Sequence, residues 1–227
     1  MKSIIFDIDG TLTDTKKVDD KCFMEAFEAV FGIDIRQQDW VDLKNVTDWG
    51  ITEEIILREW NREPTLEEYE RMIEVFVGIL QRERNHDLSQ FKEVKGAKDF
   101  FDHIRYETDW NIGIATGSWE KSALIKLDAI GINPKNIAFS NSNHYKSREE
   151  ITKHTIRQIQ EKNPVSDSEI IYLGDGAWDY RTCMNLGIHF IGIDILKDEK
   201  LSKMGAKTVF SDYTNREAII EVMKGMS

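Results

Sequence analysis

Hydrophobic residues in this chain follow two patterns. Short apolar runs end in Gly, Asp, Ser or Thr, as is typical of parallel strands that are buried on both faces. Five such runs are Ser3–Phe6, Ile112–Ala115, Ile137–Phe139, Ile170–Leu173 and Phe190–Ile193. Stretches with helical spacing separate most of the runs. This order predicts an α/β fold with an open parallel sheet.

The second pattern, in residues 15–91, is helical throughout. Apolar residues recur at helical spacing over 18–30, a short helix is predicted around 55–60, and Thr65 with Glu68 predicts a capping box at the start of a third helix. No convincing strand lies in this stretch. We therefore predict a small helical domain inserted after the first strand.

The strand and helix alternation resumes after the insert. Residues 1–14 and 92–227 are predicted to form the α/β core domain, and residues 15–91 the helical domain. In the core, Ser118 is predicted to cap one helix, and Ser147 with Glu150 predicts a capping box for the next.

Composition and charge narrow the class of protein. The 227 residues are 41% hydrophobic, which is ordinary for a globular protein, and 30 basic against 41 acidic residues give a net charge of −11. The insert alone has 10 basic and 18 acidic residues, hence −8. This acidity argues against a nucleic-acid partner, because phosphate backbones are bound by clustered Lys and Arg.

Compartment and membrane association follow from the apolar runs and the cysteines. No run approaches the ~20 apolar residues of a membrane span, and Asp7 comes too early for a signal peptide. Cys22 and Cys183 lie far apart, without the spacing of a disulfide framework or a zinc site. We expect a cytoplasmic protein.

The strongest chemical signal follows the first predicted strand. There the chain reads Asp7-Ile8-Asp9-Gly10-Thr11, which places two carboxylates at the carboxyl end of a buried strand. In an open α/β sheet this end faces the crevice where ligands bind. The alternation of a strand would separate Asp7 from Asp9, but a bend at Gly10 lets both approach one point.

This string resembles the first motif of the haloacid dehalogenase-like hydrolase superfamily, in its Asp-x-Asp phosphatase branch. The resemblance implies a Rossmann-like core with a helical cap, as in phosphoglycolate phosphatases and β-phosphoglucomutases. It also implies that Asp7 is the nucleophile and Asp9 the general acid/base. The second carboxylate points to phosphoryl transfer, because the dehalogenating members lack it.

Two further elements match the second and third motifs of that family. Thr116, followed by Gly117, ends a predicted strand in the place of the phosphate-binding hydroxyl. Lys146 is the best match to the family's phosphate-binding lysine, although Ser147 stands where the family more usually has Pro. Lys153, inside the next predicted helix, is the alternative.

The fourth element is Gly174-Asp175-Gly176-Ala177-Trp178-Asp179, which resembles the family's acidic metal-binding motif. Asp175 would bind the metal directly, and Asp179, about one helical turn on, could approach the same ion or its waters. Trp178 and Tyr180 are less usual around this motif. They either pack in the core or shape the pocket, and we favour packing.

The acidic residues of these motifs require a cation. Asp7, Asp9, Asp175 and Asp179 would place up to four negative charges in one crevice, and two unit charges about 4 Å apart repel by roughly 4 kcal/mol. We therefore predict Mg²⁺, with the Asp9 backbone carbonyl in the metal shell by family resemblance, and at least one strongly raised carboxyl pKa without metal.

The insert, as a cap over the strand ends, would supply specificity. The polar segment 44–50 is predicted to be a loop between helices, and Lys44, Thr47 and Asp48 are its candidates for substrate contact. An ordinary solvent-facing connection is an equal alternative. Gly117, next to Thr116, is a further candidate for substrate contact.

The motifs together predict a Mg²⁺-dependent phosphatase that hydrolyses a small phosphorylated metabolite through an aspartyl-phosphate. A phosphomutase acting on a sugar phosphate would use the same Asp7 and Asp9, and a non-catalytic metabolite-binding regulator is a third reading. We expect no nucleic-acid or membrane partner, and either a monomer or a homodimer.

Overall fold

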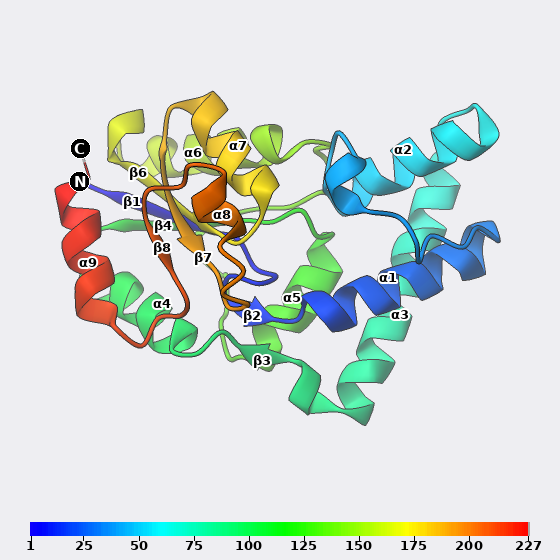
Figure 1. The fold of residues 1–227 in the computed structure, drawn as a ribbon, viewed down its shortest axis with the longest axis horizontal. Coiled ribbons are helices and arrows are strands. Elements are labelled where there is room, and N and C mark those ends of the chain that lie inside the picture. The colour runs from blue at the N-terminus through cyan, green and yellow to red at the C-terminus, as the bar shows by residue number, and fades with distance from the viewer. Residues whose placement is uncertain (227) are drawn as a thin grey trace.

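A six-stranded parallel sheet forms the centre of the molecule (Figure 1). The computed structural model describes residues 1–226. The strands are β1 (Ser3–Phe6), β4 (Asn111–Ala115), β5 (Ala138–Ser140), β6 (Ile170–Gly174), β7 (His189–Ile193) and β8 (Val209–Phe210). Their order is β5-β4-β1-β6-β7-β8, and all neighbours are parallel. The predicted fold class and five predicted strands are confirmed, whereas β8 was missed because it has only two residues.

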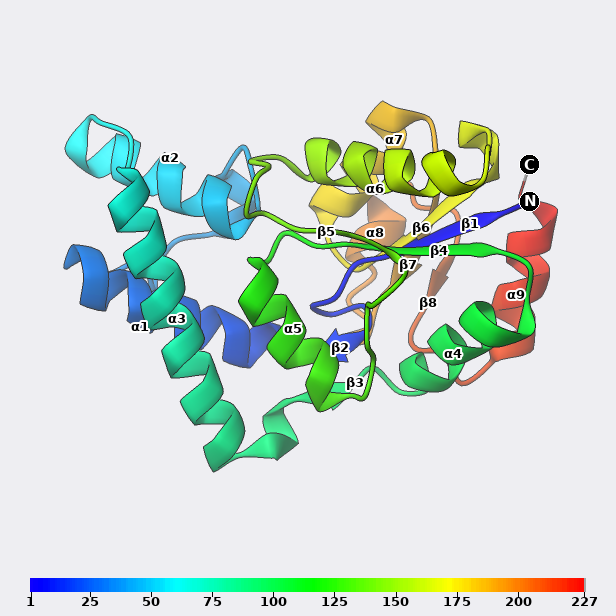
Figure 2. The same cartoon turned by 180° about the vertical axis from the view of Figure 1, so that it is seen from behind.

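Helices cover both faces of the sheet (Figures 1 and 2). Ile4 and Phe6 belong to the hydrophobic cluster on one face, and Ile5 to the cluster on the other. The first face packs against α4 (Ala97–Glu107), α5 (Glu120–Ala129) and α9 (Arg216–Gly225). The second packs against α6 (Arg148–Lys162), α7 (Ala177–Leu186) and α8 (Lys200–Lys203). Burial on both faces explains why the strands read as continuous apolar runs.

The inserted helices lie at the end of the molecule opposite the two termini (Figure 2). They are α1 (Lys16–Phe31), α2 (Asp48–Trp60) and α3 (Leu66–His86). These helices share a separate hydrophobic cluster, in which Phe23 and Phe76 stack edge-on. Trp119, from the loop after β4, packs into the same cluster and so joins it to the sheet.

A short antiparallel ladder lies where the chain leaves and re-enters the sheet region. It pairs β2 (Thr13–Asp14) with β3 (Lys92–Glu93). The predicted domain boundaries, 14/15 and 91/92, fall at this ladder and stay a prediction. Three single-turn 3-10 helices complete the secondary structure: η1 (Trp40–Asp42), η2 (Leu88–Gln90) and η3 (Asp167–Glu169). None of the helices in residues 1–226 has the length and apolarity that crossing a bilayer requires.

Two local predictions were wrong at helix starts. Segment 44–50 is only partly a loop, because α2 begins at Asp48 after Thr47, whose hydroxyl accepts a hydrogen bond from the Gly50 backbone. Ser118 does not cap α5, whose N-cap is Trp119 without a side-chain hydrogen bond. The Thr65–Glu68 and Ser147–Glu150 capping boxes are both confirmed.

Candidate active site

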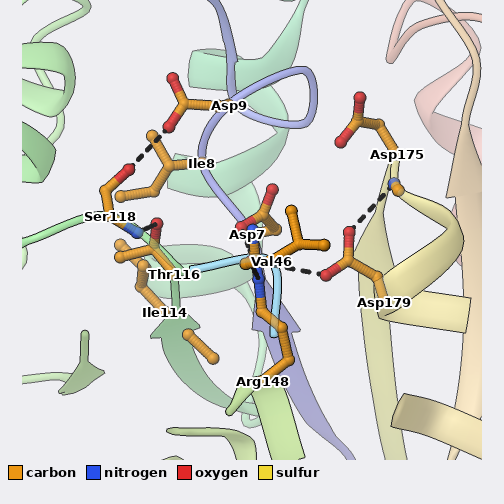
Figure 3. Close-up of polar contacts among 12 residues, drawn as sticks. Asp7, Ile8, Asp9, Val46, Ile114, Thr116, Ser118, Arg148, Asp175 and Asp179 are labelled. Carbon is orange, nitrogen blue, oxygen red and sulfur yellow. Dashed lines mark hydrogen bonds and ion pairs between the residues drawn. The ribbon is translucent and has the colours of Figure 1, made fainter. Parts of the chain in front are cut away.

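The candidate site lies at the carboxyl ends of three neighbouring strands (Figure 3). Asp7 follows β1, Thr116 follows β4, and Asp175 follows β6. Hydrogen bonds continue past the strands here, from the Asp7 amide to the Leu173 carbonyl and from the Thr116 amide to the Ser140 carbonyl. The backbone at the tip of the sheet is therefore held in place by the sheet itself.

Three carboxylates meet at this edge. Asp7, Asp175 and Asp179 each offer one oxygen, and these oxygens all lie within 4.8 Å of one another. Gly10 permits the approach: its φ of 79° is left-handed, and a Cβ there would lie 2.1 Å from Oδ2 of Asp175. The predicted convergence of the first and fourth motifs is thus observed.

Burial of this cluster alters the protonation of its carboxyls. Desolvation raises the pKa of Asp175 to about 6, although the positive charge of Lys16 acts to lower it. Desolvation likewise raises the pKa of Asp179 to about 8, although the positive charge of Arg148 acts to lower it. Desolvation also raises the pKa of Asp7. The prediction of at least one strongly raised carboxyl pKa is confirmed.

The cluster fits a hard divalent cation. Oδ2 of Asp7 and Oδ1 of Asp175 are buried without any hydrogen-bond partner among residues 1–226. A buried carboxylate oxygen without a partner is costly, and a metal ion would satisfy it. An all-oxygen donor set suits Mg²⁺. The Asp9 carboxylate lies outside this cluster, and Figure 3 shows it turned toward Ser118.

Asp9 is held by hydrogen bonds of its own. Thr15 Oγ1 donates to Oδ1 at 2.6 Å, Ser118 Oγ donates to Oδ2 at 3.0 Å, and the Lys126 ammonium also binds Oδ2. Burial alone would raise the pKa of Asp9, but the attraction of Lys126 and these hydrogen bonds lower it below its ordinary value. The carboxyl is therefore ionised at neutral pH.

Lys126 is a site residue that sequence reasoning missed. Its side chain is fully buried, and Nζ lies 2.8 Å from Oδ1 of Asp19 in α1 and 2.8 Å from Ser118 Oγ. It therefore joins Asp9, at the tip of the sheet, to the inserted helices. The available signal was a basic residue next to the apolar positions Ala123 and Leu127 of the predicted helix.

Arg148 is the cation that the structure brings to Asp7. Its Nη1 lies 2.6 Å from Oδ1 of Asp7 and 3.3 Å from Oδ1 of Asp179, and its Nε donates to the Val46 carbonyl at 3.1 Å (Figure 3). A Cβ at Gly117 would lie 2.7 Å from the guanidinium. The absence of a side chain there lets Arg148 lie across the site.

The structure does not bring Lys146 or Lys153 to Asp7. The Lys146 ammonium pairs with Glu53 of α2, and its side chain is 46% exposed. The Lys146 carbonyl accepts a hydrogen bond from Thr47, which fixes this segment against α2. Lys153 lies on the outside of α6, 3.9 Å from Glu149. The phosphate-binding role of Lys146 stays a prediction without support from this geometry.

Thr116 is buried at the tip of β4. Its Oγ1 accepts a hydrogen bond from the Ser118 amide at 3.1 Å. The carbonyl of Gly117, the next residue, accepts a hydrogen bond from the Asp48 amide at 2.8 Å. The loop after β4 is thereby attached to the start of α2.

A cavity of about 70 Å³ lies between the inserted helices and the sheet, beside Asp9. Of the predicted substrate contacts, Thr47, Asp48 and Gly117 line it, whereas Lys44 is exposed outside it. Burial raises the pKa of Asp48 to about 7.

The two aromatic residues of the fourth motif have different surroundings. Trp178 lines the cavity, with the Lys16 ammonium 5.1 Å from its ring centre, which favours the pocket-shaping alternative for this residue over packing. Tyr180 packs edge-on against Phe190, as expected.

The arrangement of this site defines a class of protein. A buried carboxylate after β1, a hydroxyl after β4 and an acidic pair after β6 lie at one edge of the sheet. A family model described as haloacid dehalogenase-like hydrolase matches residues 4–193, and the chain belongs to this family. The resemblance drawn from the motifs is therefore confirmed, and the chain is a hydrolase of that family.

Solved structures similar to this chain have the same fold. A hydrolase from Pseudomonas syringae is 21% identical, with a TM-score of 0.76 and coverage of 98% of this chain and 99% of that one. A predicted phosphoglycolate phosphatase from Haemophilus somnus is 14% identical (TM-score 0.66; 97% and 98% covered). A β-phosphoglucomutase from Clostridium difficile is 20% identical (TM-score 0.71; 99% and 97% covered). A search of curated protein sequences gave no significant match.

Proposed function

We propose that this protein is a Mg²⁺-dependent phosphatase that hydrolyses a small phosphomonoester through an aspartyl-phosphate on Asp7. The observation that supports it most is the meeting of Asp7 with Asp175 and Asp179, while Asp9 is held apart by its own hydrogen bonds. The three clustered carboxylates can thus share one cation. The Asp9 carboxyl lies apart from them and is available for proton transfer.

In the proposed reaction, the Asp7 carboxylate attacks phosphorus in line and the leaving alcohol departs on the opposite side. Arg148, which contacts Asp7, is positioned to neutralise phosphoryl oxygens as their charge develops. The Thr116 hydroxyl would bind one of these oxygens. A divalent ion held by Asp7, Asp175 and Asp179 would supply the positive charge that lets a phosphate dianion approach three carboxylates.

Asp9 would transfer the proton in both halves of the reaction. The lowered pKa holds it ionised, which is the form that activates water to hydrolyse the aspartyl-phosphate. For the first half, Asp9 must take up a proton before it donates to the leaving alcohol. The anionic substrate favours that uptake, because a dianion near Asp9 raises the free energy of its ionised form.

The test is phosphate release from p-nitrophenyl phosphate, with Mg²⁺ and with EDTA. We expect release with Mg²⁺ only, and none from Asp7→Asn, whose fold is checked by circular dichroism. A fully active Asp7→Asn protein would remove Asp7 from the mechanism. No release under any divalent ion would favour a metabolite-binding regulator.

A phosphomutase remains the alternative that shares these residues. It would return the phosphoryl group to substrate before water arrives, so isomer formation from a sugar phosphate, without phosphate release, would identify it. Cytoplasmic location, the absence of nucleic-acid and membrane partners, and a monomeric or homodimeric state stay predictions.

A further inference from the structure

Two carboxylates of the metal cluster share one pattern of contacts. Oδ1 of Asp7 binds Nη1 of Arg148 at 2.6 Å, and Oδ2 of Asp175 binds Nζ of Lys16 at 2.8 Å. The second oxygen of each, Oδ2 of Asp7 and Oδ1 of Asp175, is buried and has no hydrogen-bond partner in the part of the chain that the structure describes. Arg148 and Lys16 therefore supply positive charge to a cluster that still has two free oxygens.

The two cations differ in how firmly they are held. The Arg148 guanidinium is anchored: its side chain is 12% exposed, Nη1 also lies 3.3 Å from Asp179, and Nε donates to the Val46 carbonyl. Lys16 is 41% exposed, and within residues 1–226 its ammonium has Asp175 as its one ion-pair partner. An ammonium on a flexible four-carbon stem leaves a partner more readily than a planar guanidinium with several bonds. Lys16 is thus the cation that can move away from the cluster.

Lys16 comes from the inserted helices, whereas Asp175 belongs to the sheet region. Lys16 is the first residue of α1, and its stem crosses Gly10, where a Cβ would lie 2.8 Å from the Lys16 Cδ. The ion pair is a direct tie between α1 and the loop after β6. A change at the metal cluster can therefore reach α1 through this contact.

A second place for the Lys16 ammonium lies on α1 itself. Asp20 is four residues on, and residues at this spacing lie on the same face of a helix. Lys16, Asp20 and Trp178 all line the cavity of about 70 Å³ described above and a second cavity of about 510 Å³. The ammonium lies 5.1 Å from the Trp178 ring centre, within the range of a cation–π contact. If it left Asp175, the ammonium would therefore stay between a carboxylate and an aromatic face.

Charge decides whether the ammonium and a metal ion can share Asp175. A divalent ion on this carboxyl would repel the ammonium twice as strongly as a second unit charge at the same distance. The ion would also replace the positive charge that Lys16 provides to Asp175. Asp20 lies outside the group of acids that can hold the ion, so its attraction for the ammonium would persist. An ion at the cluster therefore favours the position of the ammonium near Asp20 over the position at Asp175.

We propose that Lys16 is an internal counter-ion of the metal site, which balances Asp175 in the metal-free protein and is displaced toward Asp20 when a divalent ion binds. The inference rests on the metal site of the proposed function and adds a residue that sets the affinity of that site. Ion and ammonium compete for Asp175, so the ion binds less tightly than it would without Lys16. Because coupling between two sites is reciprocal, a bound ion also removes the tie between α1 and the loop after β6.

Titration calorimetry with Mg²⁺, without substrate, measures this competition. Lys16→Met retains the length of the side chain and removes its charge, and we expect its Kd for Mg²⁺ to fall about fivefold or more. Lys17→Met removes the same charge from the next, exposed residue of α1, and should change the Kd less than about twofold. Lys16→Arg retains a cation and should not bind Mg²⁺ more tightly than the wild type. An unchanged or higher Kd in Lys16→Met would overturn the inference.

A structure with the ion bound gives a second readout. In crystals grown with Mn²⁺, located by its anomalous signal, we expect Nζ of Lys16 more than about 4 Å from Asp175, on the side of Asp20. An ion bound at the cluster while the 2.8 Å pair persists would contradict the displacement.

Neither measurement needs turnover, so the two proposals can fail separately. If Lys16→Met tightens Mg²⁺ binding but neither p-nitrophenyl phosphate nor other esters release phosphate, the phosphatase proposal fails and the counter-ion role stands. If phosphate is released but Lys16→Met leaves the Kd unchanged, the counter-ion role fails and the phosphatase proposal stands. The absence of Mg²⁺ binding to either protein would overturn both.

Discussion

The buried Lys126 ammonium provides a sharp test of how the inserted helices are joined to the sheet. Replacing Lys126 by Met retains the length of the side chain and removes its charge. Asp9 and Asp19 then lose their common cation while both stay buried. We expect a large loss of stability together with loss of activity.

The magnitude follows from the geometry. Nζ lies 2.8 Å from Oδ1 of Asp19, and two unit charges about 3 Å apart attract by roughly 5–6 kcal/mol at an effective dielectric of about 20. Desolvation of the ammonium offsets part of this, and removing one partner of a buried ion pair typically costs about 3–5 kcal/mol. That is a large share of the ~5–15 kcal/mol by which a domain is stable.

The loss should also depend on pH. Burial raises the pKa of Asp19 well above its ordinary value even with Lys126 present, and removal of the lysine raises it further. A carboxyl whose pKa is raised on folding contributes stability at low pH and loses it as pH rises through the folded pKa. The gap between wild type and Lys126→Met should therefore be widest at pH 8 and narrow toward pH 5.

Urea unfolding at pH 5, 6, 7 and 8, followed by circular dichroism, measures this gap. Lys121→Met, at an exposed lysine of the same helix, is the matched control and should change the free energy of unfolding by less than about 0.5 kcal/mol. Lys126→Met combined with Asp19→Asn should recover part of the loss. A gap below about 1 kcal/mol, or one that is constant with pH, would refute the reasoning.

Three further predictions concern the metal cluster and its cations. Gly10→Ala should weaken Mg²⁺ binding in calorimetry, because the new Cβ meets Asp175; Gly32→Ala has a similar positive φ and open space, and an equal effect there would contradict this. Arg148→Met should lower kcat/KM for p-nitrophenyl phosphate roughly hundredfold, and Lys146→Met less than about threefold; the reverse order would assign the phosphate-binding role to the lysine. Mg²⁺ at about 100 times its Kd should stabilise the protein by about 2.7 kcal/mol in urea, and Asp175→Asn should lose most of this; undiminished stabilisation of that variant would exclude Asp175 as a ligand.

Most local signals in the sequence were a sound guide, although the predicted Ser118 cap of α5 was wrong. The run Ser3–Phe6 predicted β1 to the residue, and the Thr65 and Ser147 capping boxes were both found at their helix starts. These features depend on neighbouring residues, on strand periodicity and on short side chains that reach only a few residues along the chain.

The convergence of Asp7 with Asp175 was also predictable, although 168 residues separate them. Both follow buried strands, and the carboxyl ends of adjacent parallel strands must meet at one edge of the sheet. The geometry of adjacent parallel strands therefore also determines where an Asp carboxyl lies, because the short Asp side chain has little rotational freedom beyond its Cβ.

Only the tertiary structure decided which cations face those carboxylates. Lys146, Arg148 and Lys126 are long side chains that can extend in several directions from their backbone, so sequence position does not determine where their charges lie. Three contacts determine it: the hydrogen bond from Thr47 to the Lys146 carbonyl, the approach of Arg148 to Gly117, which has no side chain, and the ion pair of Lys126 in α5 with Asp19 in α1. Local chemistry in the sequence thus predicted which acids converge, whereas the cations that face them depend on packing between segments that are distant along the chain.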